Sequence, residues 1–189
     1  MRIKPLKSKQ HAFTMVELLV GIAIIGILAV ISFPSLSRFT IGLRVDSEVS
    51  ELHRLILMAR NTAVTTGNKT IICPIVSDEC SNKWNKEISL IEDVDGSGDL
   101  SKNDVILRVK AKINTGDQLT FSSNSALIYS PSGNLFNNTS NLTFSYCPKN
   151  YNDESKGVVI SILGRPYITQ DFNNDGFDED RDENKIECT

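Results

Sequence analysis

The chain has 189 residues, with 20 Lys and Arg against 23 Asp and Glu, which is long enough for one ordinary globular domain and one additional element. The first twelve residues hold four of the basic residues and no acidic one, which leaves 16 basic residues against 23 acidic ones, a net charge of −7, in the remainder. An acidic chain of this kind argues against a general nucleic-acid-binding protein, which is normally basic.

Residues 1–12 form a short basic leader, and residues 13–37 carry a single charge, at Glu17. About 20 apolar residues in a helix cross a bilayer, so residues 13–37 are predicted to span a membrane. A secretory signal peptide is the alternative. Glu17 interrupts the start of the apolar run, however, and no A-x-A-like cleavage site follows before Pro34. The basic leader predicts that the C-terminal part lies outside the cytoplasm.

The helical pattern continues through residues 38–67. Apolar residues recur there at helical spacing and form one stripe, with charged residues between them. The stripe consists of Val45, Val49, Leu52, Ile56, Ala59 and Ala63. Gly67 is the expected end, and Pro34 and Gly42 are candidate bends. The sequence therefore predicts one helix of about 50 residues, with an apolar half and an amphipathic half.

Residues 68–189 have a sequence pattern typical of β-strands. Short apolar runs are separated by Gly, Asn, Asp, Ser and Pro. These runs cover residues 70–73, 87–92, 105–113, 119–122, 126–130, 141–147 and 157–163. They predict an antiparallel sheet packed on the amphipathic half of the helix, an α+β fold. The tail after Gln170 is strongly acidic.

All four cysteines, Cys73, Cys80, Cys147 and Cys188, lie in this β-rich part. An even number of cysteines outside the cytoplasm favours two disulfides over a zinc site, because no CxxC occurs and both histidines are distant in sequence. A short loop closes easily, which favours Cys73–Cys80. Cys147–Cys188 is then expected to tie the acidic tail to the sheet, although four cysteines allow three pairings.

Residues 93–104, DVDGSGDLSKND, fit the twelve-position calcium-loop pattern, with Gly98 at the sharp turn. The ligand places fall on Asp93, Asp95, Ser97, the carbonyl of Asp99, Ser101 and Asp104. Asp104 is shorter than the usual Glu, which predicts weak affinity for Ca²⁺. Neither flank is a convincing helix, and a solvated hairpin turn is the alternative interpretation.

A second match at 171–182, DFNNDGFDEDRD, has Asp171, Asn173, Asp175 and Gly176 in place. It is poorer, because Asp178 stands where an apolar residue is expected. Calcium is the one cofactor that the sequence suggests, and none is required.

No catalytic constellation is predicted, and we do not expect an enzyme. His53 falls outside the apolar stripe of the helix, and an isolated surface histidine is a weak catalytic candidate. Ser132 lacks the GxSxG frame of a hydrolase nucleophile.

Residues 11–39, HAFTMVELLVGIAIIGILAVISFPSLSRF, resemble the N-terminus of type IV prepilins. The shared features are a basic leader ending in a small residue, then Phe-Thr, a Glu as fifth mature residue, and an apolar helix containing proline; they fall on Ala12, Phe13, Thr14, Glu17 and Pro34. The leader usually ends in Gly, so Ala12 is a departure. The resemblance implies cleavage between Ala12 and Phe13 by a prepilin peptidase, N-terminal methylation, and pairing of the Glu17 carboxylate with the terminal amine of a neighbouring subunit.

The remainder resembles the GspH/FimT family of type IV pilin-like proteins. The matching segments are CPIVSDEC followed by Trp84, the acidic turn DVDGSGDLSKND, VILRV, SPSGNLF, the YCP around Cys147, and VVISILGRP. This resemblance implies a long helix cradled by β-sheet and a non-catalytic filament subunit, a minor pilin or pseudopilin. It also implies an inner-membrane anchor before assembly into a pilus, its priming complex or a periplasmic filament. The implied partners are other pilin subunits, the prepilin peptidase and the inner-membrane assembly machinery.

Two alternatives remain open from the sequence, a type II secretion pseudopilin and a DNA-binding uptake pilin. Some members of the family bind DNA through a GRxR motif, which makes Arg165 the candidate DNA contact. Here Tyr167 replaces the second Arg, and acidic residues follow from Asp171. The sequence therefore favours a turn that enters the last strand.

Overall fold

The computed structural model describes residues 13–188, apart from the side chains of residues 30–35. The predicted leader, residues 1–12, lies outside the described residues. The chain divides into two compact units, Met1–Thr40 and Ile41–Thr189.

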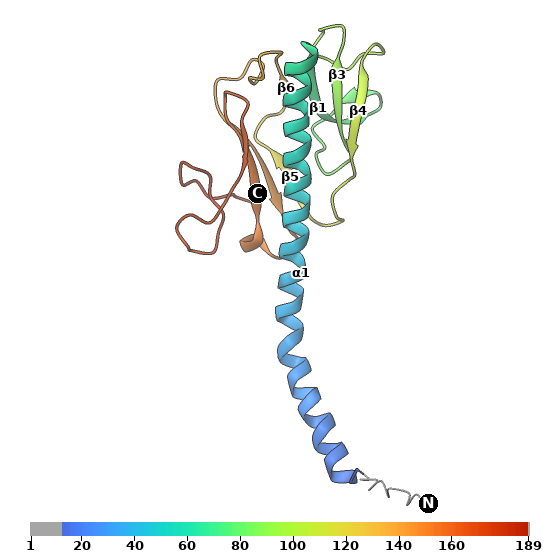
Figure 1. Ribbon diagram of the computed structural model, residues 1–189, viewed down its shortest axis with the longest axis vertical. Helices are drawn as coiled ribbons and strands as arrows, with labels where there is room; N and C mark the ends of the chain where they lie inside the picture. Colours follow the sequence, from blue (N-terminus) through green and yellow to red (C-terminus); the bar gives the residue numbers. More distant parts are fainter. Residues whose placement is uncertain (1–12, 189) are drawn as a thin grey trace, which may run out of the picture. The chain divides into compact units, whose positions relative to one another are not determined.

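One long helix, α1 (Met15–Thr66), comprises 52 residues (Figure 1). Gly67 follows with a positive φ of 76°, and its backbone N–H donates to the Ala63 carbonyl at 3.1 Å. A left-handed residue directly after a helix satisfies the last carbonyls, and glycine adopts this backbone without strain. The predicted long helix and its predicted end are therefore confirmed.

Nine strands form two antiparallel sheets within the described residues, where the sequence predicted one. The first sheet has the order β2-β1-β3-β4, with β6 pairing β1; its strands are β1 (Lys69–Val76), β2 (Glu79–Cys80), β3 (Ile88–Asp93), β4 (Val105–Lys110) and β6 (Leu127–Tyr129). The second has the order β5-β7-β8-β9; its strands are β5 (Gln118–Phe121), β7 (Leu142–Cys147), β8 (Lys156–Ile160) and β9 (Pro166–Ile168), with the short 3₁₀ helix η1 (Asn152–Glu154) before β8. Two sheets arise because β6 crosses back to β1 while β5 pairs with β7.

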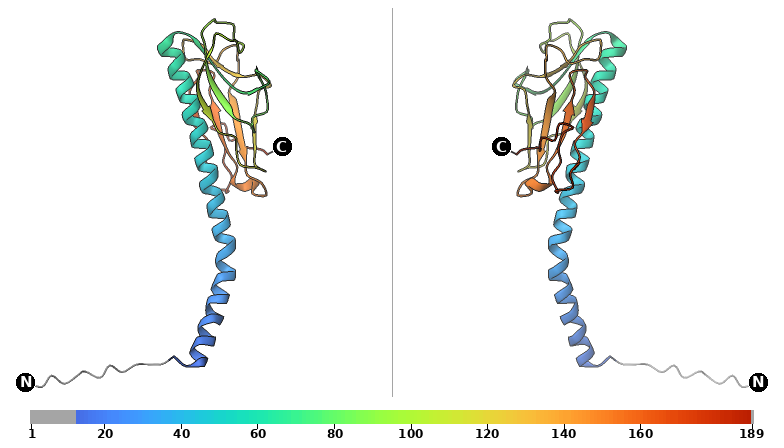
Figure 2. Two further views of the ribbon diagram at one scale, coloured as in Figure 1. Left: turned by 90° about the vertical axis from the view of Figure 1, so that its right-hand side faces the viewer. Right: turned by 90° about the vertical axis from the view of Figure 1, so that its left-hand side faces the viewer.

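Both sheets pack against the C-terminal half of α1. Figure 2 shows the strands gathered on one side of this half of the helix. All six residues of the predicted stripe are at most 2% exposed, and Leu55, which was not predicted, joins them in the core. Burial of each Val, Leu or Ile side chain in this set stabilises the fold by about 1.5–3 kcal/mol. The predicted α+β fold is confirmed.

An aromatic cluster lies in the same core. The rings of Phe121 and Phe144 are stacked with centroids 4.1 Å apart, and Trp84 meets each of them edge-on at 4.9 Å. Phe121 ends β5 and Phe144 lies in the adjoining β7. Offset and edge-to-face contacts of this kind add about 0.5–1.5 kcal/mol per pair to simple burial.

Charged side chains beside the stripe were predicted to face solvent, but several of them contact the sheets. Lys110, at the end of β4, is 2% exposed and forms an ion pair with Glu48. Lys156, at the start of β8, lies 2.7 Å from Asp46. Asp46 and Glu48 flank the apolar stripe of α1, and the long side chains of Lys156 and Lys110 reach them from the sheets.

The predicted run 105–113 is a strand only as far as Lys110.

Two glycine turns pack together near the end of α1. Gly133 and Gly164 both have positive φ, 78° and 73°, and a Cβ added to Gly164 would lie 2.0 Å from the Gly133 carbonyl oxygen. The Tyr129 hydroxyl donates to the Gly164 carbonyl at 3.1 Å, and Arg60 Nε donates to the Gly133 carbonyl at 3.0 Å. The Tyr129 hydrogen bond thus links the turn between β8 and β9 to β6, and the Arg60 hydrogen bond links the turn at Gly133 to the helix.

Among the described residues, no helix has a stretch that is both long and apolar enough to cross a membrane. The segment predicted to do so, residues 13–37, includes the six positions whose side chains are not described.

Candidate functional site

The described start of α1 exposes apolar side chains all round. Phe13 is 85% exposed and Ile25 is 67% exposed, and the large apolar residues between them are also exposed. Glu17 is the only charged residue of this stretch. Soluble monomers rarely expose an apolar surface of this extent, so it marks a face that lipid or protein covers.

Thr14 and Glu17 cap the helix. Both the backbone N–H and the hydroxyl of Thr14 donate to Glu17 Oε2 at 3.1 Å, and the Glu17 backbone N–H donates to Thr14 Oγ1 at 3.2 Å. This reciprocal arrangement is a capping box, which satisfies N–H groups that have no partner inside the helix. The capping box was not among the predicted features, although its spacing, Thr-x-x-Glu, is present in the sequence. Of the predicted processing residues, Phe13 directly precedes the cap, and Ala12 lies outside the described residues.

Two disulfides join the four cysteines in the pairs expected from the sequence. Cys73–Cys80 links β1 to β2, with a Cα separation of 5.5 Å. Cys147–Cys188 links the end of β7 to the acidic tail, with a Cα separation of 5.8 Å. The tail is also paired with itself and with the segment after β9, through the bridges of Glu179 to Gln170 and Lys185.

The first acidic turn joins β3 to β4 and brings the predicted calcium ligands into one loop. Asp93, Asp95 and Asp104 each place a carboxylate oxygen within 4.8 Å of the other two. The remaining predicted ligands lie between them: the Ser97 hydroxyl donates to the Asp99 carbonyl at 2.9 Å, and the Ser101 hydroxyl donates to Asp95 Oδ2 at 2.7 Å. Hydrogen bonds from the Ser101 hydroxyl and the Ser97 backbone N–H lower the pKa of Asp95 to about 2.

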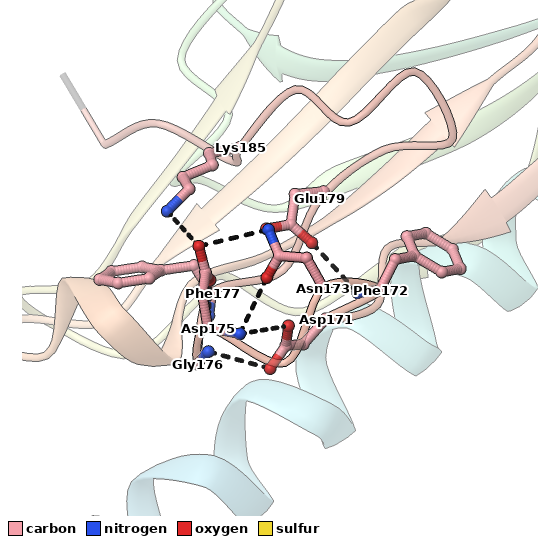
Figure 3. A network of polar contacts seen from close by, with 8 residues as sticks. All are labelled: Asp171, Phe172, Asn173, Asp175, Gly176, Phe177, Glu179 and Lys185. Carbon is pink, nitrogen blue, oxygen red and sulfur yellow. Dashed lines mark hydrogen bonds and ion pairs between the residues drawn. The ribbon is translucent and has the colours of Figure 1, made fainter.

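The second acidic turn gathers Asp171, Asp175 and Glu179 within the same limit of 4.8 Å. Figure 3 shows its network: Asn173 Nδ2 donates to Glu179 Oε1 at 2.9 Å, and the Lys185 ammonium lies 2.6 Å from Asp175 Oδ2. The Lys185 hydrogen bond lowers the pKa of Asp175. Two members of this cluster were not predicted: Glu179, which is 1% exposed, and Lys185, which supplies a positive charge from within the chain.

Arg165 lies in the turn between β8 and β9, and its side chain is exposed. The Arg165 backbone N–H donates to Ser161 Oγ at 3.2 Å, and the Ser161 backbone N–H donates to the Arg165 carbonyl at 3.1 Å. Tyr167, which replaces the second Arg of the GRxR motif, carries the Arg181 guanidinium 4.2 Å above its ring. The predicted turn that enters the last strand is confirmed at Gly164 and Arg165.

Asp117, which was not among the predicted site residues, joins α1 to the second sheet. Its carboxylate is buried, accepts the Tyr146 hydroxyl at 2.6 Å and the Lys149 backbone N–H at 2.9 Å, and forms an ion pair with Arg44 at 3.1 Å. Burial, followed by the hydrogen bond to Asp117, raises the pKa of Tyr146. His53, predicted to face solvent, is half-buried, with Nε2 3.4 Å from the Pro166 carbonyl.

Comparisons with known proteins agree with these features. A prokaryotic N-terminal methylation motif matches residues 7–33, and the family model described as type II transport protein GspH matches residues 48–164. An 81-residue stretch is 35% identical to the type IV major fimbrial protein FimA of Dichelobacter nodosus. That match covers 43% of this chain and 46% of FimA, so the chain matches just under half the length of this relative.

Two crystal structures of the type IV minor pilin FimU from Pseudomonas aeruginosa share the fold. The first has a TM-score of 0.56 and 22% identity, and it covers 70% of this chain and 92% of FimU. The second crystal form has a TM-score of 0.53 and 21% identity, and it covers 66% and 92%. A methylation motif on a long helix, followed by antiparallel sheets packed on that helix, defines a pilin-like fold. The chain belongs to the GspH family, whose model matches more than half of its length.

Proposed function

We propose that the protein is a minor pilin or pseudopilin, a structural subunit of a type IV pilus or a related filament. The observation that carries this proposal is the exposed apolar surface along the start of α1, interrupted only by Glu17. Apolar side chains on every side of a helix need lipid or other helices around them. A filament core made of such helices provides that cover, with about 25 cal/mol for each Å² of apolar surface removed from water.

Burial of apolar surface does not depend on direction, so it leaves the axial position of one helix against the next undefined. A carboxylate in apolar surroundings costs several kcal/mol unless it finds a partner, and Glu17 would therefore specify the register. The proposed partner is the terminal amine of Phe13 on a neighbouring subunit. In the single chain, the same carboxylate is bound by its own helix start through Thr14.

The proposal includes a route to the filament. A prepilin peptidase cleaves between Ala12 and Phe13, the new amine is methylated, and the helix anchors the subunit in the inner membrane until the assembly machinery incorporates it. The methylation-motif match at residues 7–33 spans the proposed cleavage point and supports processing and methylation there. Two disulfides support a location outside the cytoplasm for the β-rich unit, because disulfides persist in oxidising compartments.

Intact-mass measurement of the membrane-extracted protein tests the proposal, together with immunoblots of sheared filaments. We expect a chain that begins at Phe13 with one added methyl group, and we expect it in the filament fraction. A strain lacking the prepilin peptidase is the control and should retain residues 1–12. A chain that stays uncleaved in the wild-type strain, or is absent from every filament fraction, would contradict the proposal.

A further inference from the structure

The turn between β3 and β4 combines a cluster of carboxylates with a carboxylate oxygen that has no partner. Asp93 is 1% exposed, and its Oδ2 accepts the Gly98 backbone N–H at 2.9 Å. Its Oδ1 is buried and accepts no hydrogen bond from any described residue. An ionised carboxylate buried with an unsatisfied oxygen is strongly disfavoured, unless a cation or a donor completes its shell.

The acidic neighbours of Asp93 supply further oxygen atoms and further negative charge. Asp95 and Asp104 bring their carboxylates within 4.8 Å of it. Within residues 13–188, no Lys or Arg forms an ion pair with any of the three. Lys69, the basic residue paired opposite Asp93 in the sheet, donates instead to the Gly96 carbonyl at 2.9 Å. The Lys69 ammonium therefore binds a backbone carbonyl of the turn, near Gly98, and none of the three carboxylates has a cation of the described residues within ion-pair distance.

The second acidic turn differs from the first in the partners of its carboxylates. There Lys185 donates to Asp175 Oδ2 at 2.6 Å, and both Glu179 oxygens accept hydrogen bonds, from Asn173 Nδ2 and the Phe172 backbone N–H. The buried carboxylate of that cluster is satisfied within the chain. The buried carboxylate of the first cluster is not.

We propose that the β3–β4 turn is a Ca²⁺ site in which Asp93, Asp95 and Asp104 provide the charged ligands. Neutral oxygens lie in the same turn: the Asp99 carbonyl and the hydroxyls of Ser97 and Ser101. Calcium takes six to eight oxygen ligands in flexible geometry, whereas Mg²⁺ requires a tight octahedron, so a short loop with this mixture suits calcium better. The turn is partly open to solvent, which places its affinity in the range of extracellular calcium modules, Kd about 10⁻⁴–10⁻³ M.

Bound calcium would give Asp93 Oδ1 the partner that the chain does not supply. It would also join the last residue of β3 to Asp104, immediately before β4, and thereby brace the hairpin at the end where the turn lies. The site is independent of the filament proposal, because it requires neither the helix start nor a neighbouring subunit.

Calorimetric titration of the full-length protein in detergent, after treatment with EGTA, tests the site, with CaCl₂ and MgCl₂ as the two probes. We expect saturable calcium binding and a melting temperature that rises with millimolar calcium. Asp95→Asn removes one exposed ligand without touching the core, so it should weaken calcium binding at least tenfold. Asp93→Asn is a second variant, and its folding is checked by circular dichroism.

Two variants serve as matched controls. Glu87→Gln removes an exposed carboxylate just before β3, and Asp175→Asn alters the second acidic turn; both should bind calcium within about twofold of wild type. The proposal is overturned if the wild type shows no heat of binding and no calcium-dependent melting, or if Mg²⁺ binds as tightly as Ca²⁺. It is also overturned if Asp175→Asn, and not Asp95→Asn, loses the binding.

Discussion

Thr14 and Glu17 satisfy each other at the start of α1: the Thr14 backbone N–H donates to Glu17 Oε2 at 3.1 Å, and the Glu17 backbone N–H donates to Thr14 Oγ1 at 3.2 Å. The carboxylate proposed to set the filament register thus already has a partner in the single chain. The positive end of the helix dipole favours it there as well. Assembly would exchange this local partner for the amine of a neighbour, and the two roles can be separated by mutation.

Thr14→Ala removes the capping hydroxyl and keeps the carboxylate. It should cost the helix start about 0.5–2 kcal/mol while filament incorporation persists. Glu17→Ala removes the carboxylate, and incorporation should fall at least roughly tenfold, because the neighbouring amine then loses its charge partner in an apolar core. Immunoblots of sheared filaments measure incorporation, and near-UV circular dichroism verifies that the β-rich unit stays folded. If filament incorporation falls equally in the two variants, the effect of Glu17→Ala results from the loss of the helix cap.

Gly164→Ala should destabilise the β-rich unit by about 2–6 kcal/mol, since a left-handed alanine and an overpacked contact each cost roughly 1–3 kcal/mol. The added Cβ would meet the Gly133 carbonyl oxygen at 2.0 Å. Gly67→Ala is the matched control, because Gly67 has a similar φ of 76° and no atom within 4 Å of its added Cβ. Urea unfolding measures both variants. A loss no larger for Gly164→Ala than for Gly67→Ala would show that the two turns move apart easily.

Asp117→Ala should lower the free energy of unfolding by about 1–3 kcal/mol. It leaves the buried Tyr146 hydroxyl without its acceptor, whereas the Arg44 side chain is 34% exposed and keeps contact with water. Asp46→Ala breaks the more exposed pair with Lys156, and about 0.2–1 kcal/mol is expected there. Chemical unfolding at neutral pH compares the two variants. If the two substitutions lower the free energy of unfolding equally, Asp117 does not organise the contact between α1 and the second sheet.

Removal of each disulfide by paired Cys→Ser substitution should have unequal effects. Cys147 and Cys188 are 41 residues apart, and Cys73 and Cys80 are 7 apart. Loop-closure entropy predicts a loss of roughly 4 kcal/mol for the long loop and roughly 2–3 kcal/mol for the short one. Urea unfolding of the two double variants tests this order. A larger loss for the Cys73–Cys80 variant would mean that contacts in the native state outweigh chain entropy.

The helix was predictable because the residues that define it lie close together in the sequence. The stripe from Val45 to Ala63 and the terminal Gly67 lie within a few helical turns, and each of these residues does what its spacing indicates. The strands were located by similar local patterns. Their division into two sheets was not predictable, because it depends on the pairing of Thr70 with Tyr129, which are distant in the sequence.

In the candidate sites, too, contacts between residues that are distant in the sequence were not predictable. The acidic turns were visible as spaced carboxylates, but the burial of Asp93 and the ammonium of Lys185 beside Asp175 depend on the folded chain. Asp117 stands in an ordinary turn sequence, and only Arg44 and Tyr146, far from it along the chain, give it a role. Leu55 was omitted because a wide helical face was interpreted as a narrow stripe.

The Cys147–Cys188 bridge closes a covalent ring that contains β8, β9 and the acidic tail. Exposed loops in this ring, including the one around Asp182, are the kind of segment that extracellular proteases cleave first. A single cut inside the ring would leave both new ends attached to the same molecule. A nicked subunit would therefore keep its outer surface, and a filament containing it would lose no mass until a second cut or a reductant opened the ring.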